Sequence, residues 1–154
     1  MILVVKVAVA FDHRGVALRE AVLAALARHE VLDLGTHDPS VRVDYPDKAQ
    51  QVADAILGGE ADRGVIVCGS GAGAAIAACK VPGIRAAICH DAYSAHQAVE
   101  HDDMNVLSLG SEIVGPAVAA ELVEVFVAAR FDGGGRYVAR LEKVSRMEQG
   151  LRVA

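Results

Sequence analysis

Short apolar runs alternate with stretches of helical periodicity along the whole chain, and this alternation limits the possible folds more than any other feature. The apolar runs are rich in Val and Ile with few polar interruptions, which is typical of parallel strands buried on both faces. Strands that alternate with helices form a parallel sheet covered by helices. We therefore predict a Rossmann-like three-layer α/β/α domain with a five-stranded parallel sheet. The predicted strands are residues 3–11, 31–34, 64–68, 84–89 and 105–109; the predicted helices are 16–29, 44–57, one ending near 80, 92–100, 116–129 and 136–148.

Composition narrows the class of protein further. A chain of 154 residues that is 53% hydrophobic can bury one sizeable core, and no repeat or linker divides it, so we expect a single domain over residues 1–154. The net charge is −5, whereas proteins that bind nucleic acids or anionic membranes present a basic surface, so we expect neither as a partner. Three cysteines without a CxxC pair are typical of a reducing cytoplasm, and no stretch is long enough to span a bilayer. No histidine spacing indicates a metal site, and we expect no cofactor.

The third predicted strand ends in an unusual turn. The run Val65–Val67 leads into Cys68, then into the glycines Gly69, Gly71 and Gly73, and then into an Ala-rich helical stretch. A helix N-terminus presents unpaired backbone N–H groups, and glycines let an anion approach them closely. A cysteine at such a position is favoured as a thiolate. The sequence therefore predicts a reactive thiol beside an anion-binding loop.

In a parallel α/β fold, ligands bind beyond the carboxyl ends of the strands. The residues that follow the predicted strands are Asp12 and His13, residues 68–73, His90 and Asp91, and residues 110–112. By the same topology His101 and Asp102, which precede the fifth strand, belong to the opposite edge. We infer that these two residues reach the site only across a dimer.

Spacing argues against three known functions of glycine loops. A Walker loop needs Gly-Lys-Ser/Thr, and no lysine follows Gly73. A dinucleotide loop follows the first strand, whereas this one follows the third. A cysteine phosphatase needs an arginine six residues after the cysteine, where this chain has Ala74. A cysteine base or nucleophile beside an oxyanion-stabilising loop remains, with Ser70 available as a hydrogen-bonding partner.

Several further segments, taken together with the glycine loop, resemble the ribose-5-phosphate isomerase B family, which also contains the galactose-6-phosphate isomerase subunits. Each segment alone is weak evidence, but their joint order over nearly the whole chain is specific. They are Asp12-His13, residues 44–46, residues 59–62, residues 68–73, residues 80–87, residues 93–95, Glu100-His101, residues 105–107 and residues 134–136.

The resemblance implies an aldose–ketose isomerase that works without a metal through a cis-enediolate. Cys68 would remove the proton from C2 of the sugar, Ser70 would assist it, and the backbone from Gly69 to Ala74 would stabilise the enediolate oxygen. His101 would open the sugar ring. Some relatives use a glutamate base at the position of Ala74, and its absence favours the cysteine variant.

The same resemblance implies how substrate is held and how subunits pair. Asp12 would hold sugar hydroxyls, while His13, Arg136 and Arg140 would bind the phosphate. The family forms homodimers with sites at the interface, so we expect a homodimer with shared active sites, and a dimer of dimers is a further option. The C-terminal helix, which carries Tyr137 on its apolar side, is expected to pack on the partner.

Two departures from the family pattern concern the substrate. Asp102 stands where relatives have an asparagine, and an ionised carboxylate cannot donate a hydrogen bond. Glu112 stands where relatives have a phosphate-binding arginine, although Arg14 supplies a cation beside His13. Ribose 5-phosphate is the expected substrate. The same chemistry on a different sugar, either non-phosphorylated or differently charged, stays open, as does a non-catalytic sugar-binding protein.

The remaining cysteines have a simpler interpretation. Cys79 and Cys89 lie in apolar runs and are expected to fill the core. Asp91 is placed to cap the helix that follows it.

Overall fold

The computed structural model describes residues 3–153 and contains a five-stranded, fully parallel sheet in the order β2-β1-β3-β5-β4. The register pairs Val9 with Val65 and Val65 with Leu107, which aligns the carboxyl ends of the three central strands. The strands are β1 (Lys6–Phe11), β2 (Glu30–Asp33), β3 (Arg63–Cys68), β4 (Ala86–Ile88) and β5 (Val106–Gly110).

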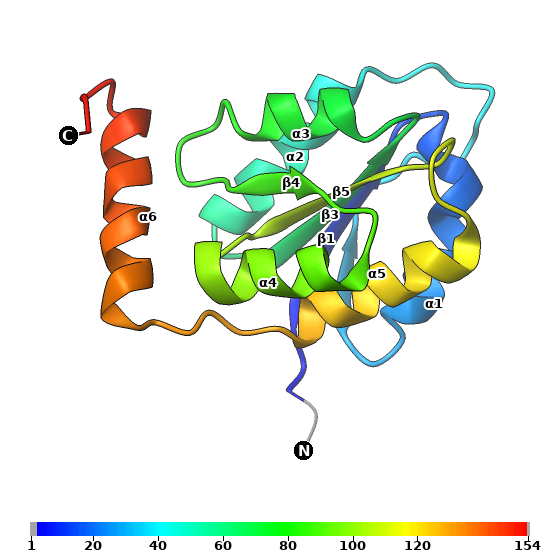
Figure 1. Ribbon diagram of the computed structural model, residues 1–154. Helices are drawn as coiled ribbons and strands as arrows, with labels where there is room; N and C mark the ends of the chain where they lie inside the picture. The colour runs from blue at the N-terminus through cyan, green and yellow to red at the C-terminus, as the bar shows by residue number, and fades with distance from the viewer. Residues whose placement is uncertain (1–2, 154) are drawn as a thin grey trace.

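Helices cover both faces of this sheet, which confirms the predicted three layers (Figure 1). Helices α2 and α3 pack together on one face, and α5 packs between α1 and α4 on the other. The helices are α1 (Arg19–Ala25), α2 (Tyr45–Leu57), α3 (Ala72–Ala78), α4 (Ala92–Asp102), α5 (Pro116–Ala128) and α6 (Gly135–Glu148), with a short 3-10 helix η1 (Gly15–Leu18) before α1.

The size of the core side chains sets how far the helices on each face lie from the sheet. The core under α1, α4 and α5 contains large residues such as Phe11, Leu122 and Phe126. The core under α2 and α3 is dominated by alanines, so these helices lie close to the sheet. At Gly64 a Cβ would lie 2.3 Å from Val52 Cγ1, so only glycine allows this approach of α2 to β3. The helices α2 and α3, whose N-termini lie near the glycine loop at residues 69–73, are thereby held tightly against the sheet.

The largest differences from the predicted element boundaries are at β1 and at the first helix. β1 begins at Lys6 rather than residue 3, because β2, its edge partner, begins pairing only at Glu30. The helix predicted over 16–29 is a 3-10 turn followed by an α-helix that ends at Ala25. Gly15 explains the irregular start: its N–H donates to the Asp12 side chain, and it lies so close to β3 that a Cβ would meet Val67 O at 2.0 Å.

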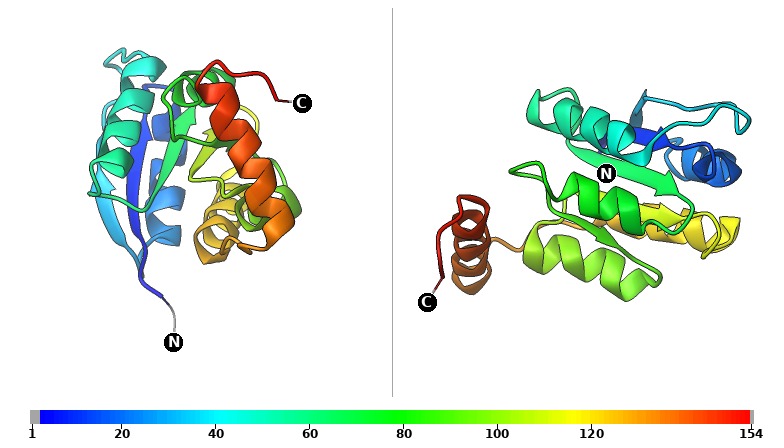
Figure 2. Two further views of the ribbon diagram at one scale, coloured as in Figure 1. Left: turned by 90° about the vertical axis from the view of Figure 1, so that its left-hand side faces the viewer. Right: turned by 90° about the horizontal axis from the view of Figure 1, so that it is seen from above.

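The C-terminal helix α6 covers neither face of the sheet and stands at its amino-end edge, where it contacts α4 (Figures 1 and 2). Tyr137 is its one buried residue within the described chain, whereas Val138, Val144 and Met147 are exposed. A groove of about 440 Å³ separates α6 from α4 and the loop before β4. Within residues 3–153, no helix is both long and apolar enough to cross a bilayer.

Candidate active site

The Cys68 thiol lies at the carboxyl end of β3, the middle strand of the sheet. Its side chain is buried, and the Gly71 N–H donates to Cys68 Sγ at 3.1 Å. Ser70 is exposed beside it, and its hydroxyl oxygen accepts from the Ala72 N–H at the start of α3. A thiol sulfur that accepts a backbone N–H at a helix N-terminus is in surroundings that favour negative charge. The predicted strand, glycine loop and helix are confirmed.

The shape of this loop depends on β5 as well as on its own glycines. Gly71 adopts φ +81°, which an L side chain rarely adopts, and its carbonyl accepts from the buried Ser108 hydroxyl at 2.7 Å. A Cβ at Gly110 would lie 2.5 Å from the Ser70 backbone. Ser108 and Gly110 therefore fix the loop from the neighbouring strand. Sequence reasoning missed Ser108 and named Gly110 only as a residue at a strand end, because both acquire this role through the pairing of β3 with β5.

Asp12 is buried at the carboxyl end of β1, next to β3. Its Oδ1 accepts from the backbone N–H groups of Arg14 (2.9 Å) and Gly15 (2.7 Å), which shapes the turn into η1. One carboxylate oxygen is thus structural. Arg14, two residues after Asp12, lies against Gly69 of the Cys68 loop.

Arg14 lies over Gly69 and pairs with Glu112. A Cβ at Gly69 would lie 2.9 Å from Arg14 Nη1, and Arg14 Nη2 lies 2.5 Å from Glu112 Oε1. The Glu112 N–H donates to Gly69 O, and the Ser111 hydroxyl donates to Arg14 O. Arg14 and Glu112 therefore neutralise each other at the mouth of the Cys68 loop. The sequence placed both residues after strand ends but did not indicate that they pair.

His13 and Tyr45 border the loop on the other side. His13 Nδ1 lies 3.2 Å from Val43 O and 3.3 Å from Val43 N, so the segment before α2 contacts the first strand end. The Tyr45 ring lies against Gly73, where a Cβ would be 2.7 Å from the ring. Tyr45, which the sequence indicated as part of a helix start and of a family segment, thus borders the candidate site.

The other cysteines differ from Cys68. Burial, and then the nearby Asp91 carboxylate, raise the pKa of the Cys89 thiol to about 11, so this core residue is a protonated thiol at neutral pH. The expectation that Cys79 fills the core is wrong. Cys79 is exposed and lines the groove beneath α6, because α3 ends there and α6 stands off from the sheet. Asp91 caps α4 as predicted, and the hydrogen bonds from Ser94 hold its pKa below the usual value.

His101 lies at the opposite edge of the sheet from Cys68. It belongs to the last turn of α4, an 11-residue helix whose length separates the two edges by about 15 Å. Its ring stacks on Tyr137 with centroids 4.5 Å apart, and its Nε2 lies 3.1 Å from the Tyr137 hydroxyl. Arg136 donates to the same hydroxyl and lies over the Tyr137 ring. The expectation that His101 cannot share a pocket with Cys68 within one chain agrees with this geometry.

Asp102 and Arg140 also lie at this far edge. Both are exposed and line the groove between α4 and α6. The predicted site residues thus form two groups. Asp12, His13, residues 68–74 and Glu112 surround the Cys68 loop, whereas His101, Asp102, Arg136 and Arg140 gather around α6.

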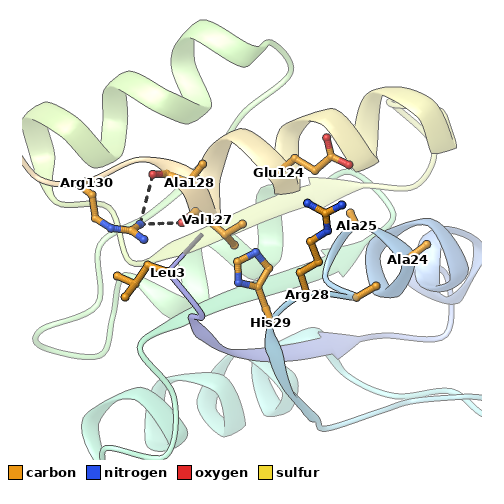
Figure 3. Close-up of a pocket in the computed structure, with 10 residues that line it drawn as sticks. Leu3, Ala24, Ala25, Arg28, His29, Glu124, Val127, Ala128 and Arg130 are labelled. Carbon is orange, nitrogen blue, oxygen red and sulfur yellow. Dashed lines mark hydrogen bonds between the residues drawn. The ribbon is translucent and has the colours of Figure 1, made fainter. Parts of the chain in front are cut away.

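A larger cavity of about 670 Å³ lies between α1 and α5 (Figure 3). Arg28, His29, Glu124 and Arg130 line it, but Arg130 donates to the carbonyls at the end of α5, and the lining contains no residue that follows a strand's carboxyl end. It is not the site predicted from the sequence. Within residues 3–153, no group of three His, Cys, Asp or Glu side chains is arranged to hold a metal ion.

The geometry around Cys68 is suited to the removal of a proton from a carbon whose product is an oxyanion. Comparison with known proteins identifies the family of this chain. Residues 7–144 match the family model described as Ribose/Galactose Isomerase. The chain is 43% identical over 146 residues to ribose-5-phosphate isomerase B of Escherichia coli, covering 94% of this chain and 97% of the relative.

Two further similarities concern a second activity and the fold. The chain is 43% identical over 104 residues to D-erythrulose-4-phosphate isomerase of Pectobacterium atrosepticum, covering 68% of each protein. It superimposes on the structure of Clostridium thermocellum ribose-5-phosphate isomerase B with a TM-score of 0.89 and 42% identity, covering 94% of this chain and 98% of that one. The chain therefore belongs to the ribose/galactose isomerase family and is an aldose–ketose isomerase.

Proposed function

We propose that this enzyme interconverts ribose 5-phosphate and ribulose 5-phosphate, with Cys68 as the base. The observation that carries the proposal is the buried Cys68 sulfur, held 3.1 Å from the Gly71 amide at the N-terminal end of α3. The similarity to ribose-5-phosphate isomerases B supports the substrate.

The chemistry follows from the surroundings of the Cys68 sulfur. Cys68 removes the C2 proton of the open-chain aldose, and the electrons of that C–H bond form the C1–C2 double bond of a cis-enediolate. Negative charge develops on the sugar oxygen, where the backbone N–H groups of residues 69–74 stabilise it. Transfer of the hydroxyl proton from O2 to O1 and return of the abstracted proton from Cys68 to C1 give the ketose. Ser70, exposed beside the sulfur, hydrogen-bonds the reacting oxygens.

Substrate binding in this proposal uses both groups of residues. Asp12 has one carboxylate oxygen that is not committed to the turn, and it accepts from sugar hydroxyls. His13, Arg136 and Arg140 hold the phosphate. Asp102 and Glu112 face the sugar and set which hydroxyl and anion positions are accepted.

A homodimer would bring the two groups together. Cys68 and His101 lie at opposite edges of one subunit, while α6 exposes Val138, Val144 and Met147. Burial of these side chains against a second copy stabilises the pair by about 25 cal/mol for each Å² of apolar surface removed from water. Each active site then combines Cys68 of one subunit with the partner subunit's His101. A dimer of dimers is the next assembly that this symmetry allows.

Isotope exchange tests the base directly. The wild-type enzyme in D₂O should incorporate deuterium at C1 of ribulose 5-phosphate and should isomerise ribose 5-phosphate. Cys68→Ala should lower both rates by about 10³-fold or more, since a positioned general base contributes about 10²–10⁴-fold. Cys79→Ala, which removes the exposed cysteine, is the matched control. Exchange that survives in Cys68→Ala would disprove the assignment of the base.

Complementation tests the shared site. Cys68→Ala and His101→Ala should each be nearly inactive as separate preparations. Unfolding and refolding them together should restore about a quarter of wild-type activity, because half the dimers are hybrids and each hybrid has one intact site. A mixture no more active than its parents would show that both residues serve the same subunit.

The pairing of Arg14 with Glu112 favours a second candidate, the same chemistry on a different sugar. The pair leaves the mouth of the loop without net charge, and Asp102 adds a carboxylate at the other edge. A non-phosphorylated or differently charged pentose, tetrose or hexose fits these changes. Similarity to a tetrulose-phosphate isomerase is consistent with a shorter sugar. Comparison of kcat/KM for ribose 5-phosphate, erythrose 4-phosphate, ribose and allose decides between them, and a preference for ribose 5-phosphate excludes the second candidate.

A further inference from the structure

Tyr137 is unlike the other residues of α6. It is 7% exposed and is buried against α4, whereas the rest of the helix is largely exposed. Its ring stacks on His101 at an interplanar angle of 19°, and its hydroxyl lies 3.1 Å from His101 Nε2. Arg136 donates to the same hydroxyl oxygen and lies with its guanidinium carbon 4.6 Å from the ring centroid. Arg136, Tyr137 and His101 are thus connected by hydrogen bonds in that order.

The direction of these hydrogen bonds follows from the donors available. An arginine side chain only donates, so the Tyr137 oxygen accepts from Arg136. The phenolic hydrogen of a buried tyrosine needs an acceptor, and within residues 3–153 His101 Nε2 is the acceptor in reach. When the Tyr137 hydroxyl donates to Nε2, the neutral form of the imidazole carries its own proton on Nδ1. Free histidine prefers the opposite tautomer, with the proton on Nε2.

We propose that Tyr137 is a positioning residue that, through His101, relays the proton which opens a cyclic sugar; this rests on the proposed function, in which His101 acts on substrate held by the partner's Cys68. The His101 Nδ1 proton passes to the ring oxygen as the C1–O4 bond breaks. Nε2 recovers a proton from the Tyr137 hydroxyl, and the phenolate formed faces the Arg136 guanidinium. The anomeric hydroxyl releases its proton to water, and C1 becomes the aldehyde. Water then returns a proton to Nδ1 while Nε2 gives its proton back to the Tyr137 phenolate, which restores the starting state.

The relay serves only substrates that have a ring to open. Ribose 5-phosphate closes through O4 and needs the step. Ribulose 5-phosphate and erythrose 4-phosphate cannot form a five-membered ring, because the required oxygen is esterified. Enediolate formation from either of these needs only the base and the oxyanion loop. The structure therefore separates the function of Tyr137 from that of Cys68 by the form of the substrate.

The test is the substitution Tyr137→Phe, which keeps the stacked ring and removes the hydroxyl. We expect the kcat for ribose 5-phosphate to fall by about tenfold or more. The rate of deuterium exchange at C1 of ribulose 5-phosphate should stay within about twofold, because acyclic substrates bypass the relay. Tyr93→Phe is the matched control, since Tyr93 is 72% exposed on α4 and its hydroxyl contacts only Gln97 within the described chain. Its rates should match those of the wild type.

A second measurement does not depend on turnover. The ¹⁵N shifts of the His101 ring, assigned by the signals lost in His101→Gln, report which nitrogen carries the proton. We expect the Nδ1–H form in the wild type and a shift towards Nε2–H in Tyr137→Phe. The proposal is overturned if His101 carries its proton on Nε2, or if Tyr137→Phe slows exchange and isomerisation equally. A wild-type enzyme that catalyses no C1 exchange would instead refute the proposed function, and the tautomer would still test the hydrogen-bonded chain.

Discussion

Glu112→Gln should improve binding of a phosphorylated substrate. Glu112 forms an ion pair with Arg14, whose guanidinium lies over Gly69 at the mouth of the Cys68 loop. The amide keeps the shape of the side chain and removes its charge. The Glu112 backbone N–H still donates to Gly69 O, so the loop should keep its conformation. Arg14 is then released to pair with an incoming anion.

The magnitude follows from charge and exposure. A phosphate paired with the outer edge of Arg14 would lie about 6 Å from the Glu112 carboxylate. Two unit charges at this separation repel by about 0.7 kcal/mol in bulk water and by about 3 kcal/mol at an effective dielectric constant of 20. Both side chains are just over half exposed, at 56% and 55%, so the lower part of this range applies. We expect a change of about 1–2 kcal/mol, which lowers KM about 5- to 30-fold.

Steady-state kinetics check this expectation. The KM for ribose 5-phosphate should fall while kcat changes less than about twofold, because Glu112 does not act on the reacting carbon. The effect should shrink in 0.5 M NaCl, where salt screens exposed charges. Arg14→Gln should raise the KM, and uncharged ribose should respond to neither substitution. Since an exposed ion pair contributes about 0–1 kcal/mol, the free energy of unfolding should change little. An unchanged or higher KM in Glu112→Gln would refute the electrostatic reasoning.

Three further predictions concern stability and reactivity. Gly71→Ala should lower the free energy of unfolding by about 1–3 kcal/mol in denaturant titrations, because alanine is strained at φ +81° and a Cβ would lie 3.1 Å from the β5 backbone. Asp91→Ala should lower Tm through loss of the α4 cap. Because hydrogen bonds lower the pKa of Asp91 from 3.8, this difference should be full above about pH 5 and should shrink as pH falls below about 4. Iodoacetamide at pH 8 should leave Cys89 unlabelled by mass spectrometry, since the pKa of its thiol is about 11, while substrate should protect Cys68 from labelling.

Hydrophobic patterning was sufficient to predict the sheet and the helices that cover it. The alternation of apolar runs and helical stretches predicts five parallel strands, and the structure contains them within a few residues of the expected bounds. Local chemistry was similarly informative: the Asp91 cap and the Cys68 turn are encoded by neighbours in sequence. The first helix was harder to predict, because its irregular start depends on the contact of Gly15 with β3.

Some residues of the candidate site could likewise be predicted from the sequence, and others could not. Cys68 and its glycines could be found from the sequence, because a strand end, a thiol and a flexible loop are contiguous. The support that Ser108 and Gly110 give to that loop could not be predicted, since it arises from the pairing of β3 with β5. The burial of Cys79 was predicted wrongly because an apolar run does not reveal that the helix opposite it stands off from the sheet.

The sequence by itself determined the fold class and the turn in which Cys68 and its glycines join a strand to a helix, and it predicted the two edges at which the candidate site residues lie. These features depend on periodicity and on contiguous residues, which the order of amino acids states directly. Only the tertiary structure decided that Arg14 neutralises Glu112, that Tyr45 lies on Gly73, and that Tyr137 joins Arg136 to His101. Each of these contacts joins residues that are brought together by the packing of helices and loops. Tertiary packing therefore decides which charged groups pair and which side chains share a hydrogen bond.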